Sequence, residues 1–285
     1  AMLRDAFIRA LSKAGKSPSE IDMVMCGDLL DQCVGSCFAL KDLEIPFVGM
    51  YGACSTMALT LCNACFAVDA GANTVAVGAS SHFASSERQF RFPLEYGGQR
   101  PQTSQWTVTG AGAAVVQNPK TAAESEKGSP HISAVHIGTI TDLGIKDANN
   151  MGAAMAPAAA RTIGGFLSDT GTSPDDYDMI VTGDLGYTGS TLLYELIKRE
   201  YGVDIRSVHK DCGLMIFDLE EQDVHSGGSG CGCSASVLCS YLLGEMNKGR
   251  LHKILFTATG ALMSPTSCKQ GQPIPGIAHS VLIEI

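Results

Sequence analysis

The sequence predicts a layered α/β fold built from two similar halves. Residues 11–29 and 167–185 resemble each other at a constant offset of 156 residues, and both contain the letters Ser-Pro and Gly-Asp-Leu. In each copy a helix ends at a glycine, Ser-Pro starts a short turn, and an apolar strand ends in Gly-Asp. Later in each half a glycine-rich turn starts an apolar helix that leads into a β-branched strand. Strands that alternate with helices need crossover connections, which favours sheets covered by helices.

The repeat and the turns place the main elements in order. The first half is expected to contain a helix up to Gly15, a strand up to Gly27, a turn at 52–56, a helix to about Ala70 and a strand at 73–77. The second half is expected to contain a helix up to Gly171, a strand up to Gly183, a turn at 227–234, a helix to about Asn247 and a strand at 254–257. The polar, proline-bounded segment 117–130 predicts an exposed loop between them. The expected halves are residues 1–130 and 131–285.

Composition and charge exclude several classes of protein. A chain of 285 residues with 45% hydrophobic and 17% charged residues is long and apolar enough for a large core, which argues against disorder. The net charge of -9 argues against nonspecific binding to nucleic acid or to anionic lipid. The chain has no apolar run long enough to span a bilayer, and its amphipathic start contains Arg4, Asp5 and Arg9. We therefore expect a soluble protein without a signal peptide or a membrane anchor of its own.

The cysteines predict reduced thiols. The sequence holds 11 of them, an odd number scattered through a glycine-rich chain, which is typical of a cytosol-like compartment. The close pairs Cys62 and Cys65, and Cys231 and Cys233, have spacings that metal sites also use. However, the first pair lies in an apolar helical run, where small buried cysteines are common. We expect neither a metal site nor a cofactor.

A set of motifs in a fixed order resembles the thiolase-like superfamily. The Gly-Ala-Cys-Ser turn at 52–55 and the segment 109–113 are similar to the ketoacyl synthase III branch. The resemblance narrows to the stage V sporulation protein AD family of spore-forming bacteria through the motifs at 87–93, 105–110, 211–213 and 274–279. It implies an α-β-α-β-α layered fold and a homodimer. It also implies a strand ahead of the first helix, so the first half is expected to lack its N-terminal strand.

The resemblance puts Cys54 at the nucleophile position of these enzymes. The helix N-terminus beside it is expected to lower the thiol pKa. In ketoacyl synthase III enzymes a histidine and an asparagine complete the site, and the repeat puts their positions at Gly183 and Cys231. In true thiolases a histidine and a second cysteine would fall near Ser229 and Thr257. We therefore expect a degenerate site without a catalytic residue, because loss of one member of such a set removes most of the rate.

The resemblance also implies dipicolinic acid, pyridine-2,6-dicarboxylate, as the ligand, alone or as its calcium chelate. The backbone N–H groups and hydroxyls of Ser55 and Thr56 suit a carboxylate. A second carboxylate could pair with Arg88 or Arg91, and the ring could stack on Trp106 or Tyr96. The residues expected to contact the ligand are Cys54, Ser55, Thr56, Asp28, His82, Arg88, Trp106 and Cys231.

Structural alternatives stay open for most of these residues. Asp28 and Asp184 occupy equivalent repeat positions, where a turn or cap is favoured over chemistry, although Asp28 could face Cys54. His82 could line the site or only end a strand, and His225 could replace the missing histidine. A place in the core or in a half-exposed strand is open for Cys54, Trp106 and Arg91.

The expected function is to bind dipicolinic acid and support its uptake into the developing spore. Membrane-embedded proteins of the same transport complex would hold the chain at the cytoplasmic face or the periphery of the spore inner membrane. The alternative from another class is an active condensing enzyme, which would accept an acyl group on Cys54 from coenzyme A or a carrier protein. A scaffold that binds no ligand is the third interpretation, and nucleic acid is not an expected partner.

Overall fold

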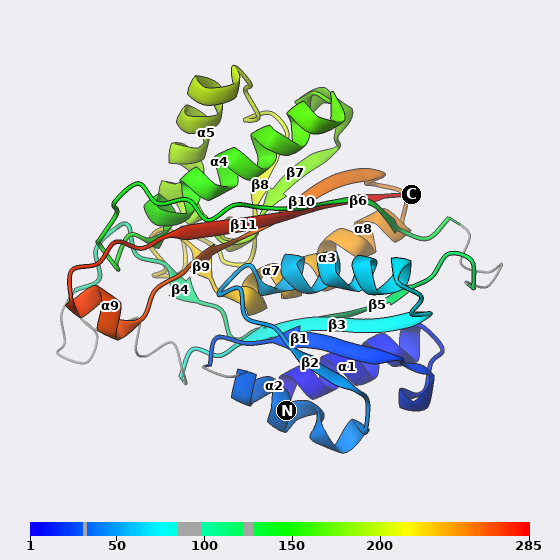
Figure 1. Cartoon of the computed structure of the whole chain (residues 1–285). Helices are drawn as coiled ribbons and strands as arrows, with labels where there is room; N and C mark the ends of the chain where they lie inside the picture. Colours follow the sequence, from blue (N-terminus) through cyan, green and yellow to red (C-terminus); the bar gives the residue numbers. More distant parts are fainter. Residues whose placement is uncertain (31–32, 85–98, 122–127) are drawn as a thin grey trace.

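The fold contains two β-sheets with helices outside and between them (Figure 1). It comes from a computed structural model that describes residues 1–30, 33–84, 99–121 and 128–285. Among the residues singled out in the sequence, Arg88, Arg91 and Tyr96 lie outside these ranges. In the described part of the chain no helix combines the length and the apolar character needed to cross a bilayer.

The N-terminal half forms a four-stranded sheet in the order β2-β1-β3-β5. The strands are β1 (Met23–Gly27), β2 (Phe47–Gly49), β3 (Thr74–Ser81) and β5 (Gly110–Gln117). The helices are α1 (Met2–Lys13), α2 (Val34–Leu40) and α3 (Thr56–Asp69), with short 3-10 turns at Pro18–Glu20 and Lys41–Leu43. Strand β1 runs parallel to both of its neighbours, and β3 pairs antiparallel with β5. The sheet therefore has the parallel centre that crossover connections require.

The C-terminal half forms a five-stranded sheet in the order β6-β11-β10-β7-β8. Its strands are β6 (His131–Ile137), β7 (Met179–Thr182), β8 (His209–Asp211), β10 (Lys253–Ala261) and β11 (Gly276–Glu284). Its longer helices are α4 (Met151–Thr170) and α5 (Gly186–Tyr201). The shorter helical segments are a 3-10 turn (Pro174–Asp176), α6 (Cys212–Met215), α7 (Cys231–Val237), a π-helical turn (Leu238–Leu242), α8 (Leu243–Asn247) and α9 (Pro265–Lys269).

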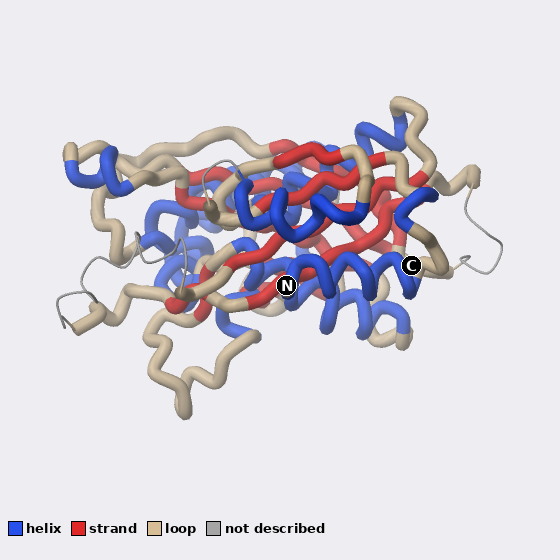
Figure 2. The backbone as a smooth tube through the Cα atoms, turned by 90° about the horizontal axis from the view of Figure 1, so that it is seen from below, coloured by secondary structure: helices blue, strands red, loops and turns tan. Residues whose placement is uncertain are grey.

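The layers follow the predicted α-β-α-β-α order, which is confirmed. Helices α4 and α5 lie outside the C-terminal sheet, α3 and α7 lie between the sheets, and α1 lies outside the N-terminal sheet (Figure 1). Seen from below, the helix next to the N-terminus lies over the strands (Figure 2). Helix α3 contacts both sheets, which explains why it is apolar on most of its surface. The largest buried cluster includes side chains from both halves and surrounds α3 and α7.

The repeated sequence pattern folds into a repeated structure. Gly15 and Gly171 follow α1 and α4 with φ angles of +62° and +64°, which glycine adopts without strain. Ser17 and Ser173 then form capping boxes at the next Pro turn of each half. Strands β1 and β7 come next. The helix-turn-strand unit predicted from the repeat is therefore confirmed in both copies.

The two sheets differ by one strand. In the C-terminal sheet β6 pairs with the outer edge of β11, whereas the described residues put no strand on the outer edge of β5 in the N-terminal sheet. The halves also meet in a two-stranded parallel ribbon, in which β4 (Trp106–Thr107) pairs with β9 (Gly228–Ser229). The ribbon brings a loop of each half to the start of α7.

Candidate functional site

The turn before α3 presents Cys54 at the junction of the two halves. Ala53 has a φ of +50°, an uncommon left-handed conformation for a residue with a side chain. Within the turn the Ser55 hydroxyl donates to the carbonyl of Gly52 at 2.6 Å, and the Thr56 hydroxyl donates to the carbonyl of Ala53 at 2.7 Å. The backbone N–H groups of Ser55 and Thr56 donate to the same two carbonyls. The donors that the sequence assigned to a ligand carboxylate are thus engaged inside the turn, and both side chains are buried.

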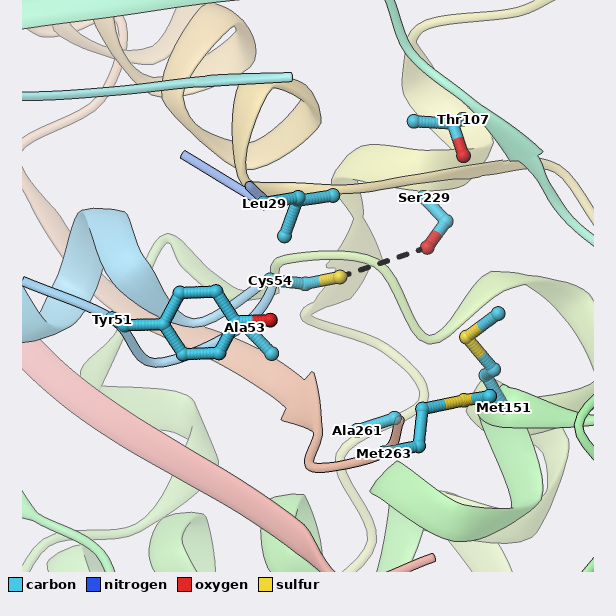
Figure 3. A pocket seen from close by; sticks show the side chains of 9 residues that line it. All are labelled: Leu29, Tyr51, Ala53, Cys54, Thr107, Met151, Ser229, Ala261 and Met263. Carbon is cyan, nitrogen blue, oxygen red and sulfur yellow. Dashed lines mark hydrogen bonds between the residues drawn. The ribbon is translucent and has the colours of Figure 1, made fainter. Parts of the chain in front are cut away.

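The buried carboxylate of Asp184, from the second half, lies close to Cys54. The Sγ of Cys54 lies 3.9 Å from the hydroxyl of Ser229 (Figure 3). That hydroxyl donates to Oδ2 of Asp184 at 3.0 Å, and the Gly230 N–H donates to the same oxygen at 2.9 Å. The Thr259 hydroxyl donates to Oδ1 at 2.8 Å. Asp184 therefore anchors the turn that faces Cys54.

The electrostatics keep the Cys54 thiol protonated. Burial raises its pKa well above the usual value, and the negative charge of Asp184 raises it further. Burial also raises the pKa of the Asp184 carboxyl, against the hydrogen bonds that it accepts. The predicted lowering of the thiol pKa is wrong, because desolvation and a neighbouring carboxylate outweigh the helix N-terminus. A thiol in this environment is a poor nucleophile at neutral pH.

A cavity opens beside the Cys54 thiol (Figure 3). Its empty volume, open mouth included, is about 370 Å³. The described residues that line it are Leu29, Tyr51, Ala53, Cys54, Thr107, Met151, Ser229, Ala261 and Met263. Most of these side chains are apolar, a few carry a hydroxyl or thiol, and none of them carries a positive charge. Apolar walls with a few polar groups are typical of small-molecule sites.

Asp28 has a structural role instead. Its carboxylate accepts hydrogen bonds from the N–H groups of Leu30 and Ser36 and from the Ser36 hydroxyl, at 2.8, 2.6 and 2.6 Å. These contacts close the segment between β1 and α2, and Asp28 is not among the described residues that line the cavity. These contacts agree with the turn alternative, and ligand contact by Asp28 stays a prediction. Asp184, its repeat equivalent, is the site residue that the sequence reasoning missed, and the shared Gly-Asp-Leu motif was the signal that pointed to it.

Two further predicted contacts lie outside the described cavity lining. His82 is exposed after β3, and its Nδ1 accepts a hydrogen bond from the N–H of Ala84 at 3.1 Å. Cys231 is buried at the start of α7, and its thiol donates to the carbonyl of Ser80 at 3.0 Å. Cys231 thus joins α7 to β3 across the junction of the halves. Ligand contact by either residue stays a prediction.

Trp106 packs against two other side chains. Its ring stacks on Phe83 with the ring centroids 4.4 Å apart, and the Arg100 guanidinium lies 4.4 Å from the centroid of the indole ring. The next residue, Thr107, lines the cavity, whereas Trp106 is not among the described lining residues. His225 lies at the same edge, with Nδ1 at 3.0 Å from the carbonyl of Pro101. The structure therefore brings together Cys54, Ser229 and Asp184, and the described cavity lining includes none of Trp106, His82 and His225.

Solved structures with the same fold define the class of this protein. The crystal structure of 3-oxoacyl-[acyl-carrier-protein] synthase III from Aquifex aeolicus VF5 superposes with a TM-score of 0.60 at 15% identity, covering 99% of this chain and 83% of that one. AbyA1, a tetronic acid condensing enzyme, gives 0.62 at 17% identity over 99% and 84% of the two chains. Cerulenin-bound OleA from Xanthomonas campestris gives 0.65 at 12% identity over 100% and 82%. The fold, with its cysteine at the start of a central helix, is that of the thiolase-like proteins.

Sequence comparison identifies the family within this class. The model of the family described as Stage V sporulation protein AD (SpoVAD) matches residues 1–284. The Stage V sporulation protein AD of Bacillus subtilis (strain 168) is 44% identical over 285 residues, covering 99% of this chain and 81% of that protein. The chain belongs to the stage V sporulation protein AD family. It is a sporulation protein with a thiolase-like fold.

Proposed function

We propose that this chain binds dipicolinic acid in the cavity beside Cys54, supports its uptake into the developing spore, and does not catalyse acyl transfer. The observation that carries the proposal is the buried Asp184 carboxylate next to the thiol. A cysteine nucleophile needs its thiolate form, which burial and a neighbouring negative charge both disfavour. The thiol and the hydroxyls of Ser229 and Thr107 then act as neutral hydrogen-bonding groups on the cavity wall.

The lining also bears on the form of the ligand. Leu29, Met151 and Met263 offer apolar surface to a flat pyridine ring. No described lining residue carries a positive charge, and burying unpaired carboxylates is costly. A calcium chelate neutralises the two carboxylates of dipicolinate before it enters. We therefore propose that the chelate binds more tightly than the free dianion.

Calorimetric titration tests both parts of this proposal. We expect saturable binding of pyridine-2,6-dicarboxylate, stronger with calcium, and no binding of pyridine-3,5-dicarboxylate, which cannot chelate in the same way. Cys54→Ala is expected to weaken binding roughly tenfold, because it removes a polar group from the wall. Cys62→Ala is the matched control: Cys62 is buried in α3, the helix that follows the Cys54 turn, and its thiol contacts the carbonyl of Ser280 instead of the cavity.

Two outcomes of these experiments would contradict the proposal. The first is no heat with millimolar dipicolinate, with or without calcium. The second is turnover of an acyl thioester together with an acyl adduct on Cys54 in mass spectra, which would establish the condensing enzyme instead.

We also propose that two copies pair along β2. This strand lies at the edge of the N-terminal sheet, and all three of its residues are exposed. The exposed fraction of Val48 is 42%, and that of Phe38 on the neighbouring α2 is 69%. Antiparallel pairing of β2 with its copy across a two-fold axis would give the unpaired backbone N–H and C=O groups of this edge strand hydrogen-bonding partners. It would also cover these side chains. Tyr51, which lines the cavity, lies two residues after the end of β2, so the dimer would border the cavity mouth.

Sedimentation equilibrium tests this arrangement. We expect the wild-type chain to be a dimer at micromolar concentration and Val48→Lys to be largely monomeric, because a lysine on an edge strand opposes strand pairing. Leu143→Lys is the control, since Leu143 is 60% exposed on the loop before α4. A Val48→Lys protein that stays dimeric would refute pairing along β2.

For its location, we propose that membrane-embedded proteins of the same transport complex recruit this chain to the spore inner membrane. Three exposed apolar side chains, that of Ile137 at the end of β6 and those of Ile140 and Leu143 in the loop before α4, offer a surface for such a protein. The chain should sediment with membranes from sporulating cells and not with vesicles of purified lipid. Equal sedimentation with both would contradict recruitment by protein.

A further inference from the structure

A chain of side-chain hydrogen bonds leads from α5 into the C-terminal sheet. The Tyr194 hydroxyl lies 2.9 Å from Nδ1 of His209, and Nε2 of His209 lies 2.8 Å from the hydroxyl of Thr182. Thr182 in turn donates to Oδ2 of Asp211 at 2.6 Å. Tyr194 is half-buried, whereas the other three side chains are buried. This series of hydrogen bonds therefore connects the half-buried Tyr194 with the buried carboxylate of Asp211.

The direction of each hydrogen bond follows from the number of hydrogens available. Thr182 gives its only hydroxyl hydrogen to Asp211, so it must accept from Nε2–H of His209. Nδ1 of His209 then carries no hydrogen and accepts from the Tyr194 hydroxyl. With Asp211 ionised, every donor in this series of hydrogen bonds thus points toward Asp211.

The same chain stays fully paired when Asp211 gains a proton. Tyr194 takes up a proton from water and passes its own to Nδ1, while Nε2–H passes to Thr182 and the Thr182 hydrogen passes to Asp211. One O–H bond forms on Asp211, each intermediate group loses one hydrogen and gains one, and no group in between is left charged. Every donor in the series now points away from Asp211, in the direction of Tyr194. The cost of an unpaired buried group is therefore avoided in both states.

Asp211 is connected to the site through the start of α5. Its carboxylate accepts from the N–H groups of Leu185 and Gly186 at 2.8 and 2.9 Å. These two residues follow Asp184 directly, so the contact fixes the turn that holds Asp184 against Ser229 and Gly230. An ionised carboxylate accepts hydrogen bonds from a helix N-terminus more strongly than a neutral one does. Protonation of Asp211 is therefore expected to loosen this turn.

The surroundings shift the pKa values of Asp211 and His209, two of the three titratable groups in this series of hydrogen bonds, in opposite directions. Burial, with repulsion from Asp184, raises the pKa of Asp211 to about 6. Burial lowers the pKa of His209 to about 3, so His209 is neutral at neutral and weakly acid pH and passes a proton without keeping one. The titratable and charged groups that act on members of the chain are Asp184, Cys212, Cys233, Lys210, Arg206 and Asp204.

We propose that Tyr194, His209, Thr182 and Asp211 form a proton relay that makes the site beside Cys54 sensitive to pH. Ionised Asp211 fastens the turn that holds Asp184, and protonated Asp211 releases it, so ligand affinity falls as the pH drops through the weakly acid range. The ligand-binding output rests on the proposed function, whereas the relay and the loosened turn are testable without a ligand.

Carbon-13 NMR of the whole protein, labelled at its aspartate carboxyl carbons, tests the relay. We expect the Asp211 signal, assigned through its loss in Asp211→Asn, to titrate between pH 5 and 7. Thr182→Val should move the midpoint upward by about one pH unit, because the ionised carboxylate loses a donor. Thr162→Val is the matched control, since the buried Thr162 donates to the carbonyl of Ala278 instead. Hydrogen exchange at Leu185 and Gly186, corrected for its intrinsic pH dependence, should become severalfold faster below the midpoint.

The possible outcomes test the relay, its coupling to the site and the proposed function separately. An Asp211 that does not titrate in this range, or a Thr182→Val midpoint equal to that of the wild type, would overturn the relay. If Asp211→Asn does not fold, the difference between the wild type and Thr182→Val assigns the signal. Dipicolinate affinity should be severalfold lower at pH 5.5 than at 7.5. Equal affinities, with the titration intact, would overturn the coupling to the site, whereas no dipicolinate binding at all would overturn the proposed function and leave the relay standing.

Discussion

Asp184→Ala is expected to lower the free energy of unfolding by roughly 3–5 kcal/mol. The substitution leaves three buried donors without their acceptor: the hydroxyls of Ser229 and Thr259 and the N–H of Gly230. Each unpaired buried donor costs about 1–3 kcal/mol. Chemical denaturation followed by circular dichroism measures the loss. In the protein that remains folded, iodoacetamide should modify Cys54 faster than in the wild type, because the charge that raises the thiol pKa is gone.

Asp28→Ala is the matched control, because Asp28 holds the equivalent position in the first repeat. Its loss leaves the buried N–H and hydroxyl of Ser36 and the part-buried N–H of Leu30 without their acceptor, so it should also be destabilising, by roughly 2–5 kcal/mol. It should leave the alkylation rate of Cys54 unchanged. If Asp28→Ala raised the alkylation rate of Cys54 as much as Asp184→Ala does, the special role assigned to Asp184 would be wrong.

Gly260→Ala is expected to destabilise the fold by about 1–3 kcal/mol and to abolish ligand binding. Gly260 lies in β10 directly against the turn that carries Cys54. A Cβ atom there would stand 2.5 Å from the carbonyl oxygen of Gly52 and 3.2 Å from the backbone nitrogen of Ser55. Since both neighbours are backbone atoms, the turn itself must move and carry Cys54 with it. Thermal unfolding and dipicolinate calorimetry report the two effects separately.

Gly244→Ala serves as the control for this substitution. Gly244 lies in α8, and a Cβ atom at this position meets nothing within 4 Å. Alanine should therefore stabilise the helix by about 0.5–1 kcal/mol and leave binding unchanged. A Gly260→Ala protein with wild-type stability and binding would show that the contact between β10 and the Cys54 turn is not essential to the site.

Much of the fold could be predicted because its signals are local. The glycine after each repeat helix, the Ser-Pro cap and the apolar strand lie within about twenty residues, and each acts through the backbone of its own segment. The duplication then placed α1 with α4 and β1 with β7 without any knowledge of their packing. The repeat by itself predicted sheets covered by helices, whereas the five-layer order was what the resemblance to thiolase-like proteins implied.

The chemistry of the site was harder to predict because it depends on contacts between distant segments. The motif around Cys54 indicated a helix N-terminus, and an exposed thiol there would be acidified. Packing buries this thiol and brings Asp184 beside it from 130 positions further along the chain, which reverses the sign of the pKa shift. The cavity wall likewise combines Leu29 with Met151 and Met263, which no local pattern connects.

The sequence by itself determined the two-half α/β architecture, the family and the position of Cys54 at a turn before a central helix. Only the tertiary structure decided which of two equivalent aspartates serves the site. Asp28 and Asp184 lie in the same Gly-Asp-Leu pattern, yet Asp28 closes a turn and Asp184 anchors the turn that faces the Cys54 thiol. The physical reason is that a side chain's pKa and its free hydrogen-bonding groups are set by burial and by the charges around it. Those surroundings come from segments that meet only when the two halves pack together.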